Sequence, residues 1–594
     1  MEMLINIIFI CAFLLFAIGM GLIKISENEQ SICKSLIVSI WTAISIGAIL
    51  AFLMSCLHIP IMLFSMTVVY SIGAVIIWIY LLLDKDKRVQ RFIFVWSDFL
   101  YIIFCSIVLG SIFIKVFGLE LSISYNGVDA GTHFSRALYV LNTHKLNRMY
   151  FTSLYNSLFI EIFQPFLLDE TLYKAFILSD AFFNLLNILM FYVVASEFVK
   201  SKFTKIVLSL IIVFYFLGWP VWSWIAGGFV YYGVGITICM YGVYLLCKLD
   251  ESHSQSIKRY YGVLLLVTLI CITECYLLFT PIFMATILIY MLYSMRNHIT
   301  KEVLIKGFAV TVMICLVVFT LIFWGFFGGN ISSIFRAFRI NGGVHRELYK
   351  DFMFLLPINT FMCVMKFKKR KIDPLAFFIM IQFIVTVLAL VANVCGVISD
   401  YYYFKLYYLG WALQMIGVVQ AVDFFWNQAR QVIYYCLLPV VMVAVLEITG
   451  LSAMIIDSIT GNSEMFPVIT QSMGYIRYLH DSKKERKEYM VTAYKWINDN
   501  LGEYHIPLIT TYDDVQITWY AAITGGKSYG IDKKGESTEE RLNNMLLFLK
   551  ESESQYFTIM KDIDMFSENV EWFDQFEKVY DDGYYGVYMI DAGK

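Results

Sequence analysis

FIFVWSDFLYIIFCSIVLGSIFIKVFG is the sequence of residues 92–118, and YNGVDAGTHFSRALYVLNTHKL follows it closely as residues 125–146. The first stretch is apolar over more than the roughly 20 residues that a helix needs to cross a bilayer. The second carries an acid, two histidines and basic side chains. The pair predicts a transmembrane helix that leads into a polar helix at the membrane surface.

The rest of the chain shares the apolar character of residues 92–118. Of its 594 residues, 59% are hydrophobic and 15% are charged, and the formal net charge is −2. Soluble domains carry about 25% charged residues, so the excess of apolar side chains predicts a polytopic membrane protein. The near-neutral charge argues against a nucleic-acid partner, which requires a concentrated basic surface.

We expect an all-α membrane domain of about 13–14 transmembrane helices, judged by the length of the apolar segments. The candidate spans are 3–23, 31–57, 61–83, 92–118, 175–198, 205–219, 229–248, 260–273, 275–295, 304–328, 351–365, 374–398, 403–427 and 432–455. The segments 260–273 and 351–365 are short, so they either cross the membrane or enter it only in part.

Short basic loops predict the orientation of these helices, because cytoplasmic loops are enriched in Lys and Arg. The basic loops lie at 85–91, 200–205, 296–301 and 366–371. Alternating spans place all four on one side. Residues 119–174, residues 329–350 and everything after about residue 457 then lie on the extracytoplasmic side.

The chain changes character after Ile456. Amphipathic helical patterns are expected at 483–504, 513–526 and 538–551, and strand patterns at 506–512, 554–561 and 584–590. Strands that alternate with helices predict a small α/β domain. We therefore divide the chain into an N-terminal transmembrane extension (1–91), a membrane domain (92–456) with the external loop 119–174, and an extracytoplasmic α/β domain (457–594).

The polar helix in residues 125–146 has two different faces. Helical spacing groups the titratable side chains Asp129, His133 and Arg136. The opposite face carries Phe134, Leu138 and Leu141. Such a helix is expected to lie flat at the interface with its apolar face in lipid. The alternative is that Asp129 caps the helix while His133 and Arg136 are merely solvated.

Three further groups of residues are candidates for a site at the extracytoplasmic surface. Tyr403 and Lys405 lie in SDYYYFKLYYLGWAL (399–413), which is either a binding site or an interfacial aromatic belt with a snorkelling lysine. Arg336 and Arg339 lie in SSIFRAFRINGG (332–343), which either binds an anion or is a solvated loop. Glu274, at the turn between two spans, is a second acid, a metal ligand or a wet loop residue.

The order and sidedness of these features resemble those of the GT-C-fold membrane glycosyltransferases, a group that includes protein O-mannosyltransferases and lipid A aminoarabinose transferases. In that group a transmembrane helix leads into an external loop that holds the catalytic aspartate on juxtamembrane helices. By this resemblance residues 92–118 would be that helix, and GVDAGTHFSRAL (127–138) would hold the acid. Residues 399–413 are similar to a Tyr-rich late helix, and AYKWINDN (493–500) is similar to the start of the external domain. The resemblance covers roughly residues 92–594.

The resemblance implies an inverting transfer of a sugar from a polyprenyl-phosphate donor to an extracytoplasmic glycan, lipid or protein acceptor, at a bacterial cell membrane. A carboxylate must then take the proton of the acceptor hydroxyl. The resemblance assigns this role to Asp129, with His133 orienting it or contacting the acceptor. Arg136, Arg336, Arg339 and Lys405 are the cations available for the lipid phosphate, and Tyr403 and Glu274 complete the expected substrate-binding residues.

A divalent metal is left open, because the second external loop, WPVWSWIAGGF (219–229), has no acidic motif. A nucleotide-sugar donor is not expected. The D-x-D at 84–86 lies in a loop too short to fold a nucleotide-binding domain.

Two other functions compete with the transferase. A transporter or flippase for a lipid-linked sugar or another solute would be expected to show paired halves, and no internal pairing is found. A non-catalytic membrane receptor would place Asp129 far from any cavity.

Overall fold

The structure is a computed structural model of the whole chain, and the residues it describes fall into several ranges. These are 2–24, 26, 29–83, 88–125, 127–146, 151–167, 172–217, 219–295, 332, 336, 338–340, 344, 348–369, 373–428, 486–501, 506–510, 515–524, 528–530, 537–551, 554–561 and 563–590. The expected spans 304–328 and 432–455 lie outside these residues.

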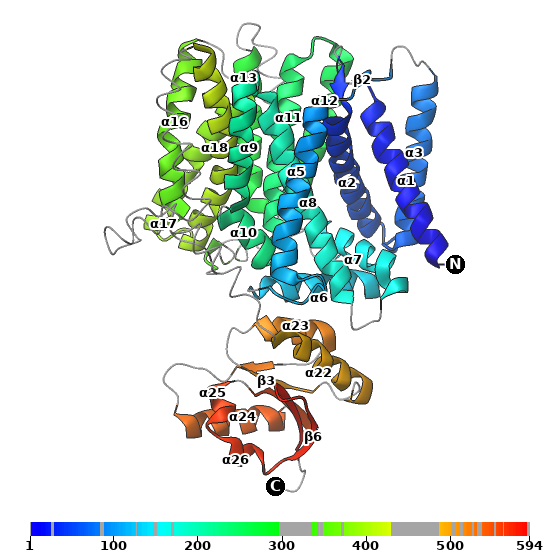
Figure 1. Cartoon of the computed structure of the whole chain (residues 1–594), viewed down its shortest axis with the longest axis vertical. Coiled ribbons are helices and arrows are strands. Elements are labelled where there is room, and N and C mark those ends of the chain that lie inside the picture. The colour runs from blue at the N-terminus through cyan, green and yellow to red at the C-terminus, as the bar shows by residue number, and fades with distance from the viewer. Residues whose placement is uncertain are drawn as a thin grey trace.

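A bundle of roughly parallel helices forms one body, and a smaller domain lies beyond one of its ends (Figure 1). Ten helices in the described part of the chain are long and apolar enough to cross a membrane. They are α1 (Glu2–Leu22), α2 (Ile32–Cys56), α3 (Leu63–Leu82), α5 (Trp96–Phe117), α8 (Leu172–Glu197), α11 (Val230–Glu251), α12 (Gln255–Cys275), η3 with α13 (Leu277–Phe279 and Thr280–Met295), α17 (Pro374–Val394) and α18 (Asp400–Gln428).

The expected transmembrane architecture is confirmed for these ten helices, with two differences in detail. The segment predicted to be short at 260–273 is a full span, because α12 begins at Gln255 and runs for 21 residues. The segment predicted at 205–219 forms α9 (Lys202–Leu217), which has only 16 residues. The other helices of the body are α10 (Trp219–Ala226) and α16 (Leu348–Lys368).

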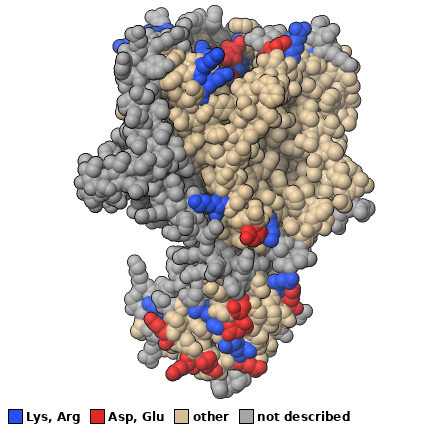
Figure 2. Space-filling view, in the orientation of Figure 1, with Lys and Arg blue, Asp and Glu red and all other residues tan. Residues whose placement is uncertain are grey.

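The surface of the body is divided between charged ends and an apolar middle. On the face seen in Figure 2, Lys, Arg, Asp and Glu gather at the two ends of the body and on the smaller domain. Between them, large apolar side chains are exposed on different helices, including Ile72, Leu100, Val263 and Leu388. Lipid is the solvent that such a surface requires, so the chain is a multi-pass membrane protein.

Two short helices close the end of the body that faces the smaller domain (Figure 1). They are α6 (Asp129–Thr143) and α7 (Phe151–Phe163), the latter followed by η1 (Gln164–Phe166). At the opposite end, β1 (Gln30–Ser31) pairs in parallel with β2 (Phe92–Ile93) and ties the chain before α2 to the chain before α5.

The smaller domain contains a five-stranded mixed sheet of order β4-β3-β5-β7-β6. Its strands are β3 (Leu508–Thr510), β4 (Ser528–Gly530), β5 (Tyr556–Met560), β6 (Glu577–Asp581) and β7 (Tyr585–Met589). Its helices are α22 (Arg486–Leu501), α23 (Val515–Thr524), α24 (Thr538–Glu551), α25 (Asp564–Ser567) and α26 (Val570–Phe573). The predicted α/β class is confirmed. The sequence did not indicate β4 and β6, because one is very short and the other reads EKVYD.

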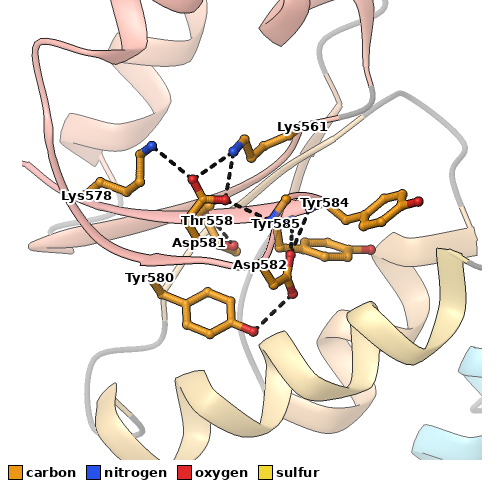
Figure 3. A network of polar contacts seen from close by, with 10 residues as sticks. Thr558, Lys561, Lys578, Tyr580, Asp581, Asp582, Tyr584 and Tyr585 are labelled. Carbon is orange, nitrogen blue, oxygen red and sulfur yellow. Dashed lines mark hydrogen bonds and ion pairs between the residues drawn. The ribbon is translucent and has the colours of Figure 1, made fainter.

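Two neighbouring acids of this domain, Asp581 and Asp582, are bonded within the hairpin of β6 and β7 (Figure 3). Asp581 accepts hydrogen bonds from Lys561 at 2.7 Å and Lys578 at 2.9 Å. Partial burial opposes ionisation, but these two ammonium groups hold the pKa of Asp581 at about 2. Asp582 accepts from the backbone N–H of Tyr585 at 2.7 Å, so both carboxylates stabilise the turn between β6 and β7.

Candidate active site

The loop after α10 packs directly against the first turn of α6. Gly228 has a φ of +76°, and a Cβ on it would lie 2.5 Å from the Cβ of Ala130. Glycine adopts this left-handed backbone conformation without strain and leaves room for the contact. The loop after α10 thus packs beside Asp129, the residue just before Ala130.

The smaller domain holds α6 from another side. A Cβ on Gly131 would lie 2.4 Å from Oγ1 of Thr518 in α23, so the two helices touch at this glycine. Trp519 is fully buried, and its ring centroid lies 5.3 Å from that of Phe134 and 6.3 Å from that of Phe176 in α8. The smaller domain is therefore docked on α6 through an aromatic cluster.

This docking corrects one prediction about α6. Its apolar face was expected to lie in lipid, but Phe134 is buried between α8 and α23. The physical reason is that an apolar helix face can be covered by lipid or by protein side chains, and sequence pattern cannot distinguish the two environments. A further bond fixes the loop before α6, because the Tyr125 hydroxyl donates to Oδ2 of Asp180 in α8 at 2.7 Å.

Asp129 begins α6 but does not cap it. The N-cap residue is Val128, and no side chain caps this helix end. The carboxylate is half-buried, and among the described residues it has neither a hydrogen-bond partner nor an ion pair. Loss of solvent raises the pKa of Asp129, while the charges of Lys405 and Arg136 lower it. The capping alternative is therefore wrong, and the carboxylate is available for proton transfer.

Lys405 is buried in α18, with only 8% of its surface exposed. Its ammonium donates to the hydroxyl of Tyr276 at 2.7 Å and to that of Tyr401. The rings of Tyr232 and Tyr276 lie 5.3 Å from Nζ, and the ring of Tyr401 lies 4.0 Å away. We refer to these three tyrosines as the tyrosine cage.

The tyrosine cage rules out a snorkelling lysine, whose ammonium would lie in water. No carboxylate of the described chain is within ion-pair distance of Lys405. Phenol hydroxyls and ring faces stabilise an ammonium less than an anion does. A buried cation in this setting is suited to binding the anionic group of a ligand.

His133 lies one turn beyond Asp129 along α6, and Arg136 lies two turns beyond it. The His133 ring is buried and packs edge-on against Tyr231 at a centroid distance of 3.8 Å. Burial and the nearby charges of Arg136 and Lys405 hold the pKa of His133 well below its usual value. Nη1 of Arg136 lies 3.5 Å from Nδ1 of His133. Both effects favour the neutral imidazole, which contacts the Arg136 guanidinium and the Tyr231 ring.

Arg336 and Arg339 lie near the same end of the body, but both side chains are exposed. The segment between and after them is tied to the start of α18. The Ser399 N–H donates to the carbonyl of Phe338 at 2.9 Å, and the Ser399 hydroxyl donates to that of Ile340 at 2.7 Å. The two guanidiniums are thus placed beside the helix that carries Lys405, and they are not among the charges acting on Asp129.

Tyr403 and Glu274 occupy separate positions from this group. Tyr403 is buried and shares a hydrogen bond with Tyr407, on a different face of α18 from Lys405. Glu274 is 2% exposed in the last turn of α12, and its Oε1 has no hydrogen-bond partner in the described chain. Its interpretation as a wet loop residue is wrong, because α12 continues through it and buries it.

Three parts of this site were not assigned from the sequence. Tyr232 and Tyr276 complete the cage around Lys405, and Trp519 docks the smaller domain. Tyr276 follows Glu274 by two residues, at the boundary between two spans, so an aromatic residue at a span end was the available signal. Nothing local indicated Trp519, since its partners lie hundreds of residues earlier in the chain.

The described residues do not suit a metal at this site. No three His, Cys, Asp or Glu side chains come together anywhere in the described part of the chain. The charged neighbours acting on Asp129 are the cations Lys405 and Arg136. These would oppose a divalent ion at the carboxylate, so no step is assigned to a metal.

The solved structures that match this chain include the following two. The Archaeoglobus fulgidus oligosaccharyltransferase in its apo form is 12% identical, with a TM-score of 0.48, covering 77% of this chain and 69% of that protein. ArnT from Cupriavidus metallidurans, bound to undecaprenyl phosphate, is 12% identical, with a TM-score of 0.46, covering 83% of this chain and 98% of that protein. Both are GT-C glycosyltransferases, the group that the sequence resembles. No family model and no curated protein sequence matches the chain.

Proposed function

We propose that this protein is an inverting membrane glycosyltransferase that uses a polyprenyl-phosphate-linked sugar. It transfers the sugar to a hydroxyl-bearing glycan, lipid or protein at the membrane face that carries the smaller domain. This face is extracytoplasmic in the proposed orientation. The observation that carries the proposal is the pairing of an unbonded carboxylate, Asp129, with a buried, caged cation, Lys405, within electrostatic reach of each other at the end of the membrane body.

Asp129 acts as the general base. Its half-buried carboxylate takes the proton from the acceptor hydroxyl while that oxygen attacks the anomeric carbon of the sugar. Partial desolvation makes the carboxylate more basic than one in water. The absence of a hydrogen-bond partner among the described residues leaves its oxygens available to the acceptor.

Lys405 and Arg136 bind the leaving group. As the bond between the anomeric carbon and the phosphate oxygen breaks, the electron pair passes to the phosphate, and its charge must be stabilised. The tyrosine cage holds the Lys405 ammonium in place without neutralising it. Because Lys405 and Arg136 also stabilise the ionised form of Asp129, one pair of cations serves both ends of the transfer.

His133 is a positioning residue in this scheme. Its neutral ring packs on Tyr231 and contacts the Arg136 guanidinium, so it fixes the direction of that side chain. Arg336 and Arg339, exposed beside the start of α18, are suited to the first contact with an anionic lipid headgroup.

The test uses membranes that contain the full-length chain and a panel of labelled polyprenyl-phosphate sugars. Wild type is expected to consume one of these donors, whereas Asp129→Asn and Lys405→Gln each lose about a hundredfold or more in rate. Glu120→Gln is the control for Asp129→Asn, because Glu120 is an exposed carboxylate in the same external loop. Donor consumption that is equal in wild type and Asp129→Asn would remove Asp129 as the base.

A further inference from the structure

A polar cavity lies at the opposite end of the membrane body from Asp129. It has a volume of about 410 Å³ and is bounded by β1, β2 and the adjoining ends of α2, α5, α8, α9 and α11. Figure 2 shows Lys, Arg, Asp and Glu gathered at this end of the body. The proposed transfer reaction has no role for a cavity on this side.

Asp98 is the one buried acid among the four that line the cavity, the others being Glu29, Glu197 and Glu251. It lies in the first turn of α5 and is only 5% exposed. Its Oδ1 accepts a hydrogen bond from the Tyr192 hydroxyl at 2.7 Å, and its Oδ2 has no partner among the described residues. Asp98 lines the cavity, so its Oδ2 is available to a hydrogen-bond donor supplied by a ligand.

Lys34 and Lys205 form the basic part of the same cavity. Neither ammonium has a hydrogen bond or an ion pair with any residue of the described chain. The third lysine, Lys248, differs because Glu197 and Glu251 neutralise it at 2.5 and 3.0 Å. Asp98 and Lys34 thus face one cavity without pairing to each other, which is the arrangement that a ligand with charges of both signs would complete.

The position of the cavity indicates where such a ligand resides. The neighbouring Trp96 is 68% exposed, and its ring packs against Phe94 and Phe99 at 5.0 and 6.0 Å. Exposed aromatic side chains at the end of a span mark the headgroup level of a bilayer. A ligand at this depth is most directly supplied by the membrane itself.

We propose that this cavity binds the headgroup of a phospholipid that carries a primary ammonium and a phosphate, of the phosphoethanolamine type. The ammonium donates to Oδ2 of Asp98, and the phosphate contacts Lys34 and Lys205. A primary ammonium fits better than a choline group, because it offers N–H donors to Oδ2 that the choline group lacks.

The test measures binding to the delipidated full-length protein in detergent by equilibrium dialysis. The probes are dihexanoyl phosphatidylethanolamine, dihexanoyl phosphatidylcholine and soluble phosphoethanolamine. The ethanolamine lipid is expected to saturate at one molecule per chain, with about tenfold tighter binding than the choline lipid. Asp98→Asn and Lys34→Gln are each expected to weaken it about tenfold.

Two variants on the same face serve as matched controls. Asp250→Asn changes a carboxylate that also bonds to a tyrosine, Tyr290, but lies outside the cavity. Lys200→Gln removes an exposed ammonium outside the cavity. Neither control is expected to change lipid binding.

Two results would overturn the assignment. Unchanged binding in both Asp98→Asn and Lys34→Gln would remove the headgroup from this cavity; these two variants change different helices, so misfolding of one leaves the other informative. Soluble phosphoethanolamine binding as tightly as the lipid would assign the cavity to a water-soluble ligand and refute the lipid.

Discussion

Replacing Trp519 with alanine removes the side chain that docks the smaller domain on α6. The ring is fully buried and contacts Phe134, Phe176 and Tyr125 at centroid distances of 5.3, 6.3 and 6.0 Å. Truncating a buried Trp to Ala costs about 3–5 kcal/mol. Because these partners belong to the membrane body, we expect most of that loss to weaken the contact between α23 and α6.

The expected loss is a change of about a hundredfold or more in the equilibrium between the docked and undocked smaller domain. Limited proteolysis of the full-length protein in detergent measures it, since undocking exposes α23. Sugar transfer should fall in parallel, because Gly131 and Thr518 hold the first turns of α6 in place.

Trp519→Phe is the matched control. Nε1 of Trp519 is buried without a hydrogen-bond partner in the described chain, so phenylalanine keeps an aromatic ring and removes an unsatisfied donor. We expect it to change the docking equilibrium by about 1 kcal/mol or less. Cleavage of Trp519→Ala at the wild-type rate, with wild-type transfer, would refute the docking role.

Further outcomes follow from individual contacts. Burial raises the pKa of Asp129 above its usual range, so the transfer rate should fall with decreasing pH around a pKa higher than that of a free aspartate; a pH–rate profile without this limb argues against Asp129 as the base. Gly228→Ala places a Cβ 2.5 Å from that of Ala130 at a positive φ, so transfer should fall by tenfold or more while folded yield changes little. The pKa of Asp581 is depressed to about 2. Its contribution to stability is therefore present above the usual aspartate pKa near 4 and is lost as pH falls toward 2. Asp581→Asn should lower the free energy of unfolding by about 1 kcal/mol or less at neutral pH, as measured by chemical unfolding of the smaller domain within the full chain.

Much of the architecture was predictable because it depends on local pattern. Residues 92–118 contain a span because their apolar length matches a bilayer, and the expected polar helix follows it as α6. The smaller domain follows the expected alternation of strands and helices. The predicted boundaries at 91/92 and 456/457 remain predictions, and the second of them lies outside the described residues.

The candidate site was predictable only in part. Asp129 and Lys405 were singled out by residue type and depth. In the structure the charge of Lys405 acts on the pKa of Asp129, so the two groups lie within electrostatic reach of each other. The partners of Lys405 were not foreseen, because Tyr276 is 129 positions away along the chain. Tyr403, which is closer in sequence, faces Tyr407 instead.

The sequence by itself determined that this chain is a membrane body with an α/β domain, since apolar length, charge sidedness and helical or strand periodicity are properties of neighbouring residues. Only the tertiary structure decided that the apolar face of α6 meets Trp519 and that tyrosine rings surround Lys405. It also decided that Asp98 and Lys34 share a cavity. These arrangements depend on which distant side chains come into contact and exclude water or lipid. The packing of whole helices decides those contacts, and a local sequence pattern does not record it.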